Sequence, residues 1–380
     1  METHNKPIRV LEVCQRMEAA GVQSFLMNMY RNIDKEKVQM DFLVHYKEHQ
    51  FFDNEIERMG GKIYRLSVRE NYNFIKYWFD LRKLFREHPE YHIIHGHMDT
   101  LGVVYLKCAK KMGVPIRIAH AHNDSVQNGI KKPFRLFMIR LYKKYANCLM
   151  ACSYNAGKFM FGDCNFHVMN NAIDISKYGY NEKMRAKKRE ELGLTDNFVI
   201  GNVGRFHVQK NQLFLIDVLK QLISFDQTAK LLLIGSGEME AEIEDKIEKE
   251  GVKKHVMILK NRADVNDLYQ AMDMFVLPSL YEGLPVSGIE AQASGLPCVF
   301  SSSVTSKADI TGNVNFISLD KEALEWAKAI KNIHKTFERK IVDEKIKMAG
   351  YDAKEEAEKL QNFYLKIDGE ALEKQETNNV

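Results

Sequence analysis

The chain has 380 residues and a formal net charge of +4, with 45% hydrophobic and 28% charged residues. This length exceeds what one hydrophobic core usually organises, and the composition excludes a disordered chain, so two globular domains are expected. No run of 18 apolar residues occurs, and the polar residues 1–7 lead directly into a strand-length apolar run. Neither a membrane span nor a secretory signal is therefore predicted, and a cytoplasmic protein is expected.

Charge and cysteine usage add two further expectations. Residues 1–172 contain 26 Lys and Arg against 17 Asp and Glu, a net charge of +9, which leaves −5 for residues 173–380. A basic first half and an acidic second half indicate two domains with different partners. The six cysteines include no C-x-x-C pair, so buried free thiols are expected rather than zinc ligands or disulfides.

Strand-like and helix-like segments alternate along the first half. Short apolar runs predict strands at residues 8–13, 40–44, 62–66, 91–95, 116–119 and 148–152. Amphipathic segments predict helices at residues 22–32, 51–59, 74–87, 101–112 and 132–145. This order predicts a parallel sheet with helices on both faces.

The second half repeats the alternation, with strands predicted at residues 197–203, 230–234, 256–259, 274–277 and from 298. Helices are predicted at residues 211–224, 238–250, 264–272 and 285–294. The expected fold class is α/β, with two doubly wound domains whose strands point their carboxyl ends into a ligand cleft. The polar residues 181–191 predict a solvated linker helix, and the polar tail from residue 368 is expected to be disordered.

The stretch FVLPSLYEGLPVSGIEAQASGLPCV, residues 275–299, predicts a strand, a loop, a helix starting at Pro285 and a second strand. Glu282 lies in the loop and Glu290 in the helix, so the two bracket a helix N-terminus, which attracts anions. Carboxylates accept hydrogen bonds from sugar hydroxyls, so a ligand with phosphates and hydroxyls would fit. The alternative is a loop glutamate and a helix glutamate in an ordinary ion pair.

Two further clusters follow strands of the second half. In GNVGRFHVQKN, residues 201–211, Arg205 and Lys210 stand at the carboxyl end of a strand, where they suit a diphosphate leaving group. The alternative is a pair of surface cations. In LLIGSGE, residues 232–238, Gly235 and Gly237 allow close backbone approach to a nucleotide, although a tight turn without a ligand explains them equally well.

Histidines follow two strands of the first half, His95 and His97 in IIHGHMD and His120 and His122 in IAHAHND, where Asn123 comes next. At strand ends facing a cleft, such side chains can bind a hydroxylated acceptor or a sugar. For any one of these histidines, a structural role with satisfied hydrogen bonds is the alternative.

These motifs together resemble those of a known enzyme family. Glu282 and Glu290, within PSLYEGLPVSGIEAQASGLP, are similar to the E-x7-E signature of retaining family 4 glycosyltransferases with the GT-B fold. Arg205 and Lys210 lie in a string that resembles the family's G-R-x-x-x-x-K-N diphosphate element, and His97 matches the second histidine of its H-x-H element. The resemblance runs from residue 8 to about residue 365 and is closest from 197 to 299.

The resemblance implies two Rossmann-like domains facing across a cleft, an acceptor-side domain at 1–172 and a nucleotide-sugar donor domain at 173–345. It further implies a C-terminal helix at 346–367 that crosses back to the first domain, before the tail at 368–380. The string NNAID at residues 170–174 is similar to the family's N-G-I-D junction, with Ala172 where glycine is usual.

The resemblance also implies roles for single residues. Arg205 and Lys210 would stabilise the leaving diphosphate, Glu282 would hold the transferred sugar, and His97 would touch it near the reacting centre. The implied donor-binding residues are Glu290 on the ribose, with Gly21, Gly204, Gly235, Gly237, Gly283 and Leu284. His120, His122 and Asn123 would lie on the acceptor side. The string AGVQ at residues 20–23 falls where the family often has G-G-x-E, so Ala20 and Gln23 depart from the pattern.

The implied function is a retaining, metal-independent transfer of a hexosyl or N-acetylhexosaminyl group in exopolysaccharide or capsule synthesis. The donor is a nucleotide-diphosphate sugar, with a UDP-sugar expected, and the acceptor is a saccharide, expected to be lipid-linked. No Asp-x-Asp motif occurs, so neither a metal nor another cofactor is expected, and nothing in the sequence suggests a nucleic-acid partner. The alternatives are a nucleotide-sugar epimerase or phosphorylase of the same fold, or a non-catalytic nucleotide-sugar-binding subunit.

The segment 131–145, KKPFRLFMIRLYKKY, is amphipathic when wound as a helix. Its apolar side comprises Phe134, Phe137, Met138, Leu141, Tyr142 and Tyr145, and lysines and arginines occupy most of the other side. Weak peripheral contact with the inner face of an anionic membrane is therefore predicted. The alternative, which can coexist with it, is a helix packed on the sheet with a solvated basic back.

Overall fold

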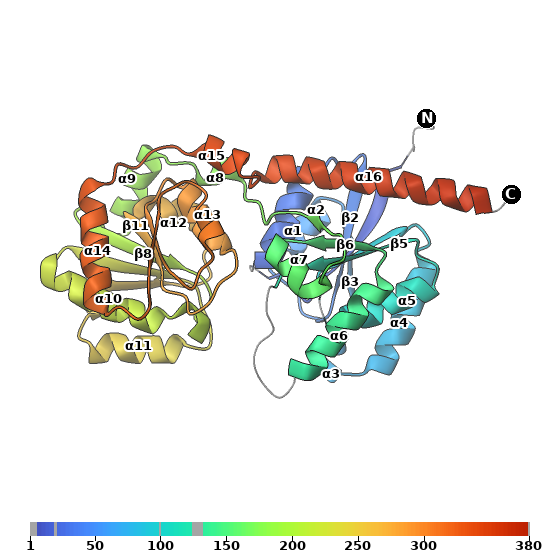
Figure 1. The fold of residues 1–380 in the computed structure, drawn as a ribbon, viewed down its shortest axis with the longest axis horizontal. Helices are drawn as coiled ribbons and strands as arrows, with labels where there is room; N and C mark the ends of the chain where they lie inside the picture. The colour runs from blue at the N-terminus through green and yellow to red at the C-terminus, as the bar shows by residue number, and fades with distance from the viewer. Residues whose placement is uncertain (1–5, 19–20, 99, 124–131, 379–380) are drawn as a thin grey trace. The chain divides into compact units, whose positions relative to one another are not determined.

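The computed structural model describes residues 6–18, 21–98, 100–123 and 132–378. The chain divides into two compact units (Figure 1). The first unit comprises Met1–Ala172 with Gly350–Val380, and the second comprises Ile173–Ala349. Each unit contains one parallel sheet with helices packed on it, which confirms the predicted fold class.

The sheet of the first unit has seven strands in the order β3-β2-β1-β4-β5-β6-β7, and all neighbours are parallel. Its central strands are mostly apolar and are buried on both faces, as helices on both sides require. The strand order reverses between β1 and β4, which makes that point the topological switch point, where ligands bind in open α/β sheets. The strands are β1 (Ile8–Val13), β2 (Val38–Val44), β3 (Ile63–Arg65), β4 (Ile93–Gly96), β5 (Ile116–Ala121), β6 (Cys148–Ala151) and β7 (His167–Val168).

Helices cover both faces of this sheet. One core, which includes Tyr77, Tyr105 and Tyr142, lies under α4, α5, α6 and α7, and the other lies under α1 and α16. The helices are α1 (Gly21–Asn32), α2 (Asp53–Arg58), α3 (Val68–Asn71), α4 (Phe74–Glu87), α5 (Gly102–Lys111), α6 (Lys132–Tyr145), α7 (Tyr154–Phe161) and α16 (Ala353–Asn378). None of the described helices combines the length and low charge that a membrane crossing needs.

Helix α16 differs from the prediction at both ends. It begins at Ala353 rather than 346 and runs to Asn378, so the expected disorder from residue 368 is wrong over residues 368–378. Leu360 and Tyr364 bury its inner face against the first unit. Further along, Asp368 is only 2% exposed, and its Oδ1 lies 3.2 Å from His92 Nδ1. The sequence hid this docking because residues 368–378, DGEALEKQETN, are mostly polar.

The sheet of the second unit has six parallel strands in the order β10-β9-β8-β11-β12-β13. Its switch point lies between β8 and β11. The strands are β8 (Phe198–Val203), β9 (Ala229–Ile234), β10 (Val256–Leu259), β11 (Met274–Leu277), β12 (Cys298–Ser301) and β13 (Val314–Ile317). The helices are α8 (Ile175–Tyr178), α9 (Glu182–Glu191), α10 (Gln212–Phe225), α11 (Glu240–Lys249), α12 (Val265–Ala271), α13 (Val286–Ala293), α14 (Ala323–Thr336) and α15 (Asp343–Met348).

Helix α9 is not the solvated linker that its composition predicted. Arg185 and Arg189 lie 2.5 Å and 3.1 Å from the carboxylate oxygens of Asp273. The same carboxylate accepts a 2.7 Å hydrogen bond from the backbone N–H of Val199, at the start of β8. Two arginines therefore anchor the helix to the second unit, and its many exposed charges concealed this contact.

Candidate functional site

The loops that follow β8 and β11 meet at the switch point of the second unit. Lys210 Nζ lies 2.8 Å from Glu282 Oε1, and the two side chains are 16% and 13% exposed. The loops are held together beside this pair, because the Leu280 N–H donates to the Gln209 carbonyl at 2.8 Å. The Gln209 side chain in turn donates to the Tyr281 carbonyl at 2.9 Å. The structure thus brings together two predicted site residues that are far apart in sequence.

The Lys210–Glu282 pair leaves one carboxylate oxygen of Glu282 unsatisfied. Glu282 Oε2 is buried and has no hydrogen-bond partner among the described residues. Asn211 fixes the end of the Lys210 loop, because its backbone is left-handed (φ 56°) and its side chain donates to the Pro278 carbonyl at 3.2 Å. The site therefore offers a fixed ammonium beside an unsatisfied carboxylate oxygen, which suits a ligand carrying both an anion and a hydroxyl.

Arg205 does not join the Lys210–Glu282 pair. Its side chain is 70% exposed, and its guanidinium lies 3.0 Å from Glu238 Oε2. His207 Nε2 lies 3.3 Å from the other oxygen of Glu238. Exposed ion pairs are weak, so an arriving anion can displace Glu238 from the arginine at little energetic cost. Nothing in the sequence marks Glu238 as the partner of this arginine.

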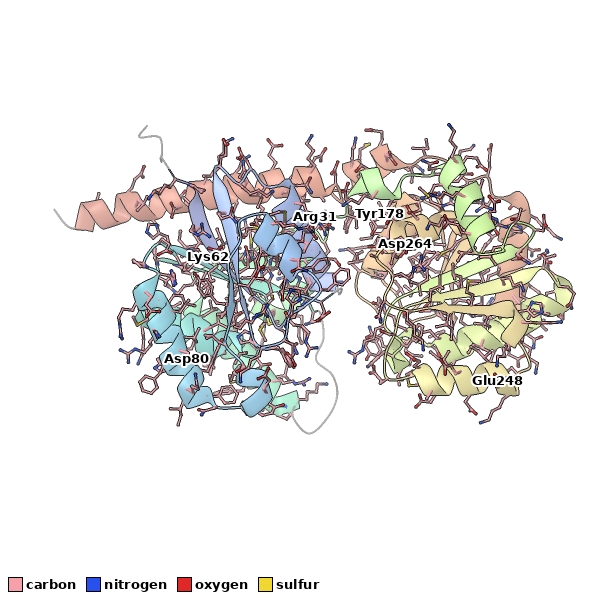
Figure 2. All side chains as sticks on the ribbon, turned by 180° about the vertical axis from the view of Figure 1, so that it is seen from behind. Arg31, Lys62, Asp80, Tyr178, Glu248 and Asp264 are labelled. Atoms are coloured by element: carbon pink, nitrogen blue, oxygen red, sulfur yellow. The ribbon has the colours of Figure 1, made fainter. Side chains whose placement is uncertain are left out.

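Glu290 is held by two phenols that the sequence analysis did not find. Tyr178 on α8 donates to Glu290 Oε1 at 2.8 Å, and Tyr269 on α12 donates to Glu290 Oε2 at 2.9 Å (Figure 2 labels Tyr178). Burial raises the pKa of the Glu290 carboxyl, and the two phenol hydrogen bonds oppose that rise. Each carboxylate oxygen keeps a second lone pair, so the predicted role toward ribose hydroxyls is compatible with this geometry.

The glycines after β8 and β9 are explained by packing between the two loops. Gly204 (φ 155°) and Gly235 (φ 150°) adopt backbone angles that disfavour other residues. A Cβ at Gly235 would lie 2.0 Å from the Gly204 carbonyl oxygen, and one at Gly237 would lie 2.3 Å from the Phe206 carbonyl oxygen. The tight-turn alternative therefore accounts for these glycines by itself, and their contact with a nucleotide stays a prediction.

Gly283 and Leu284 lie directly before α13, whose N-cap is Pro285. The Pro285 carbonyl accepts from the N–H groups of Gly288 and Ile289 at 2.9 Å and 3.2 Å, which closes the first turn. Only Gly283 and Leu284 therefore separate Glu282 from the N-cap of this helix. Free backbone donors and the helix dipole at such an end favour a phosphate.

The first unit places a polar cluster at its own switch point. His95 on β4 lies beside its register partner Glu12 on β1, and His97 directly follows β4. His120 lies on β5, and His122 follows that strand. The structure thus brings together the four predicted histidines and adds Glu12. Glu12 could not be predicted as a member of the cluster, because one glutamate inside the apolar strand IRVLEV forms no ligand pattern.

The members of this cluster bond to one another. His97 Nε2 lies 2.8 Å from Glu12 Oε2, and His97 Nδ1 lies 2.8 Å from His122 Nε2. His95 Nε2 lies 3.0 Å from His120 Nδ1. Two other predicted residues of this unit stand apart from these bonds: Asn123 is exposed, and the space around Gly21 at the start of α1 is open. Ala20 lies outside the described residues.

Burial makes the cluster neutral rather than cationic. It lowers the pKa of His97 to about 3 and places the pKa values of His95, His120 and His122 well below their ordinary value. It raises the pKa of Glu12 to about 8, against the opposing hydrogen bond from Tyr364. At neutral pH the rings therefore act as hydrogen-bonding groups and not as positive charges for a phosphate.

Three of these rings lie close enough together to hold a transition-metal ion. Ring nitrogens of His95, His97 and His120 all lie within 4.8 Å of one another. His95 and His97, however, use both nitrogens in hydrogen bonds, and His120 uses one. The mutual hydrogen bonds therefore account for the cluster without an ion.

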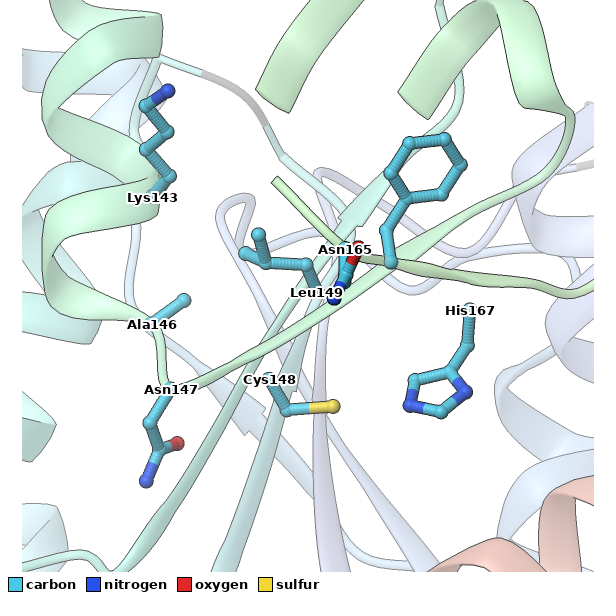
Figure 3. A pocket seen from close by; sticks show the side chains of 8 residues that line it. Lys143, Ala146, Asn147, Cys148, Leu149, Asn165 and His167 are labelled. Atoms are coloured by element: carbon cyan, nitrogen blue, oxygen red, sulfur yellow. The ribbon is translucent and has the colours of Figure 1, made fainter. Parts of the chain in front are cut away.

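A surface cavity of about 340 Å³ lies elsewhere in the first unit (Figure 3). It is lined by Cys148 and Leu149 at the start of β6 and by His167 at the start of β7. These are the amino ends of parallel strands, and ligands of open α/β sheets bind at the carboxyl ends. The cavity is therefore separate from the switch-point cluster.

Comparison with known proteins places this architecture in a family. The sequence matches the family models "Glycosyltransferase Family 4" over residues 19–177 and "Glycosyl transferases group 1" over residues 197–336. It is 33% identical over 368 residues to the putative glycosyltransferase EpsF of Bacillus subtilis, covering 94% of this chain and 96% of that protein. The chain belongs to glycosyltransferase family 4. It is a glycosyltransferase, as the E-x7-E motif predicted.

Other relatives are more distant. A UDP-Gal:alpha-D-GlcNAc-diphosphoundecaprenol alpha-1,3-galactosyltransferase of Escherichia coli is 26% identical over 313 residues, 79% of this chain and 80% of that protein. The crystal structure of Anabaena Alr3699/HepE with UDP aligns at a TM-score of 0.76 and 18% identity, covering 95% of this chain and all of that one. WaaG aligns at a TM-score of 0.65 and 15% identity, covering 92% and 95%. These structures support the GT-B fold.

Proposed function

We propose that this family 4 glycosyltransferase transfers a hexosyl or N-acetylhexosaminyl group from a UDP-sugar, with retention and without a metal. Its acceptor is a lipid-linked saccharide in exopolysaccharide or capsule synthesis. The observation that carries the proposal is the Lys210–Glu282 pair, with its open oxygen Glu282 Oε2, at the switch point of the second unit. The E. coli relative, whose name specifies a UDP-sugar and a diphosphoundecaprenol acceptor, supports the substrate classes.

Lys210 has the role of stabilising the leaving diphosphate. Negative charge gathers on this group as the glycosidic bond breaks, so a fixed ammonium stabilises the transition state more than the ground state. The exposed Arg205 adds a second cation when its weak pair with Glu238 opens. The N-terminus of α13 contributes backbone N–H donors and its dipole.

Glu282 has the role of orienting the transferred sugar. Its Oε1 is held by Lys210 at 2.8 Å, and its buried Oε2 accepts a sugar hydroxyl. A carboxylate so fixed by an ammonium serves as a hydrogen-bond acceptor, and no protein nucleophile is assigned. Retention then follows from attack on the face that the diphosphate leaves, with a donor phosphate oxygen taking the acceptor proton.

The two cations and the helix end supply the positive potential that a divalent ion provides in other transferases. Activity in the presence of EDTA is therefore expected to equal activity without it. Loss of activity on chelation that magnesium restores would contradict the metal-independent mechanism.

Helix α6 supports weak contact with an anionic membrane. Ile139 and Tyr142 pack into the core, whereas Phe134 and Phe137 are 59% and 55% exposed among basic residues. The predicted apolar side is thus divided, with its later part buried and its earlier part at the surface. Exposed aromatics between lysines and arginines suit the headgroup region of anionic lipid, where each basic residue contributes about 1 kcal/mol.

Co-sedimentation with liposomes tests this contact. Binding to phosphatidylserine vesicles should exceed binding to phosphatidylcholine vesicles and should weaken as salt rises. Replacing Phe134 and Phe137 together by serine should reduce it, whereas Phe225→Ser, at a residue 46% exposed in the second unit, should not. Equal binding to both vesicles, or an unchanged double variant, would reject the contact.

The transferase assay follows UDP release from UDP-sugars with and without a bacterial lipid extract. Release that depends on the extract, together with labelled sugar in the lipid fraction, is the expected result. Release without any acceptor would indicate hydrolysis or another reaction of the donor, and binding without turnover across all extracts would indicate a non-catalytic subunit.

A further inference from the structure

The sheet face that α1 and α16 cover in the first unit carries five polar side chains in an apolar setting. Side chains alternate along a strand, so Glu12 shares this face with Val10, and His95 shares it with Ile93. The rings of His97, His120 and His122 pack around Phe25 of α1. Such a group is costly to bury unless its hydrogen bonds are satisfied, so the direction of each bond matters.

When Glu12 is ionised, its Oε1 can only accept, and this fixes the direction of every hydrogen bond in one chain. Tyr364 donates its only proton to Glu12 Oε1 at 2.9 Å, and burial keeps this phenol protonated. The phenol oxygen must therefore accept from His95 Nδ1 at 2.5 Å, which leaves His95 Nε2 as an acceptor. His120 Nδ1 then donates to His95 Nε2 at 3.0 Å, and His120 Nε2 is left with a lone pair.

The second oxygen of Glu12 sets the other chain. It accepts from His97 Nε2 at 2.8 Å, so His97 Nδ1 is an acceptor. His122 Nε2 donates to that nitrogen at 2.8 Å, and His122 Nδ1 is left with a lone pair. Among the described residues, neither His120 Nε2 nor His122 Nδ1 has a hydrogen-bond partner, and both atoms are buried. The two chains thus end in two open ring nitrogens on stacked rings, whose centroids lie 4.2 Å apart.

We propose that the proton on Glu12 sets whether His120 Nε2 and His122 Nδ1, which the sequence places on the acceptor side, present two acceptors or one acceptor and one donor to sugar hydroxyls. The proposal rests on the proposed function, since it gives these histidines a sugar ligand. A hydroxyl both donates and accepts, so it can bind either form, whereas a phosphate, which only accepts at alkaline pH, cannot bind two acceptors.

Protonation of Glu12 reverses one chain whichever oxygen takes the proton. A proton on Oε2 is donated to His97 Nε2, so His97 Nδ1–H then donates to His122, and His122 Nδ1 becomes a donor. A proton on Oε1 is donated to the Tyr364 oxygen, so Tyr364 donates to His95 and His120 Nε2 becomes the donor. Glu12→Gln has the same effect permanently, because its amide must donate to one of the two neighbours.

The surroundings of Glu12 favour this switch at mildly alkaline pH. The groups that face it are His95, His97, Tyr364 and Cys14, and burial keeps all four neutral. Burial raises the pKa of Glu12 to about 8, since no cation lies against it among the described residues. The pair of open nitrogens is therefore acceptor and donor at neutral pH, and becomes two acceptors as pH rises through about 8.

Histidine nitrogen NMR of the full chain, labelled at histidine, tests the proposal directly. Above the Glu12 pKa, His120 and His122 should show unprotonated Nε2 and Nδ1, respectively, and one of the two should gain its proton as pH falls through about 8. Glu12→Gln should show one chain reversed at every pH, with both histidine rings of that chain in the other tautomer. Glu290→Gln, a matched change at the buried carboxylate of the second unit, should leave all four ring patterns as in the wild type.

Ligand probes complete the test. UDP-glucose, as a donor-side probe, and methyl N-acetylglucosaminide, as an acceptor-side probe, are added at alkaline pH with inorganic phosphate as control. A shift of His120 Nε2 and His122 Nδ1 with one of the sugars, and none with phosphate, supports the proposal and identifies the source. A protonated open nitrogen above the Glu12 pKa, or no shift with either sugar, overturns it, even if UDP release shows that the transferase function holds. If Glu12→Gln does not fold, the wild-type titration carries the same test.

Discussion

Replacing Lys210 by methionine removes the ammonium while keeping most of the side-chain volume. The Lys210–Glu282 pair is mostly buried, so the stability lost on breaking it should lie between the values for a surface pair and for a fully buried pair. We expect the free energy of unfolding of the second unit to fall by about 2 kcal/mol. If Lys210 stabilises the leaving diphosphate as proposed, kcat for transfer should fall about 10²- to 10³-fold, with a smaller change in KM for the donor.

The matched control is Lys220→Met, which removes an exposed lysine that lies 2.7 Å from Glu250 in the same unit. This change should alter stability by less than about 0.5 kcal/mol and leave kcat unchanged. Urea unfolding followed by fluorescence gives the stabilities, and initial rates of UDP release give the kinetics. A Lys210→Met variant that is destabilised no more than Lys220→Met would contradict the structural role of the pair. A rise in KM alone would make Lys210 a simple binding residue.

Three further predictions concern carboxylates and the C-terminal helix. Glu290→Gln should fold and weaken donor affinity about tenfold to a hundredfold, because one charge-assisted hydrogen bond contributes roughly 1.5–3 kcal/mol; unchanged affinity in calorimetry would exclude the ribose role. In the folded protein the pKa of Glu12 is raised from 4.5 to about 8, so folding favours the protonated carboxyl. The free energy of unfolding should therefore fall as pH rises from 4.5 to about 8. Wild-type stability should fall over that range and Glu12→Gln should flatten the fall, whereas parallel profiles would show that this carboxyl is not the cause. Deleting residues 368–380 should lower stability by about 1–2 kcal/mol, since it removes the buried Asp368 at His92, and an unchanged melting temperature would mean that the tail does not dock.

The two sheets could be predicted because parallel strands buried on both faces leave continuous apolar runs. VMIL at residues 256–259 and MFVL at residues 274–277 begin and end where the sequence placed them. The position of Lys210 and Glu282 at strand ends was also readable, since each follows such a run by a few residues. Their contact depends on the strand order, in which β8 and β11 are neighbours although two strands separate them in sequence.

What the sequence could not predict are contacts whose second partner has no local signature. Tyr178 and Tyr269 reach Glu290 from two different helices, and a tyrosine in an amphipathic helix looks like any core residue. Tyr364 reaches Glu12 across most of the chain in the same way. The prediction of a solvated linker at helix α9 was wrong for a different reason, because its ten mostly charged residues hide the two arginines that anchor it.

The proposed transfer of sugar from a UDP-sugar depends on the Lys210–Glu282 pair. The most direct measurement is transfer of labelled sugar from a pool of UDP-sugars into a bacterial lipid extract, in EDTA, by the wild type and by Lys210→Met. We expect labelled lipid and stoichiometric UDP with the wild type, and about 10²- to 10³-fold slower labelling with the variant. Labelling that needs a divalent ion, or that proceeds at the wild-type rate in Lys210→Met, would contradict the proposal.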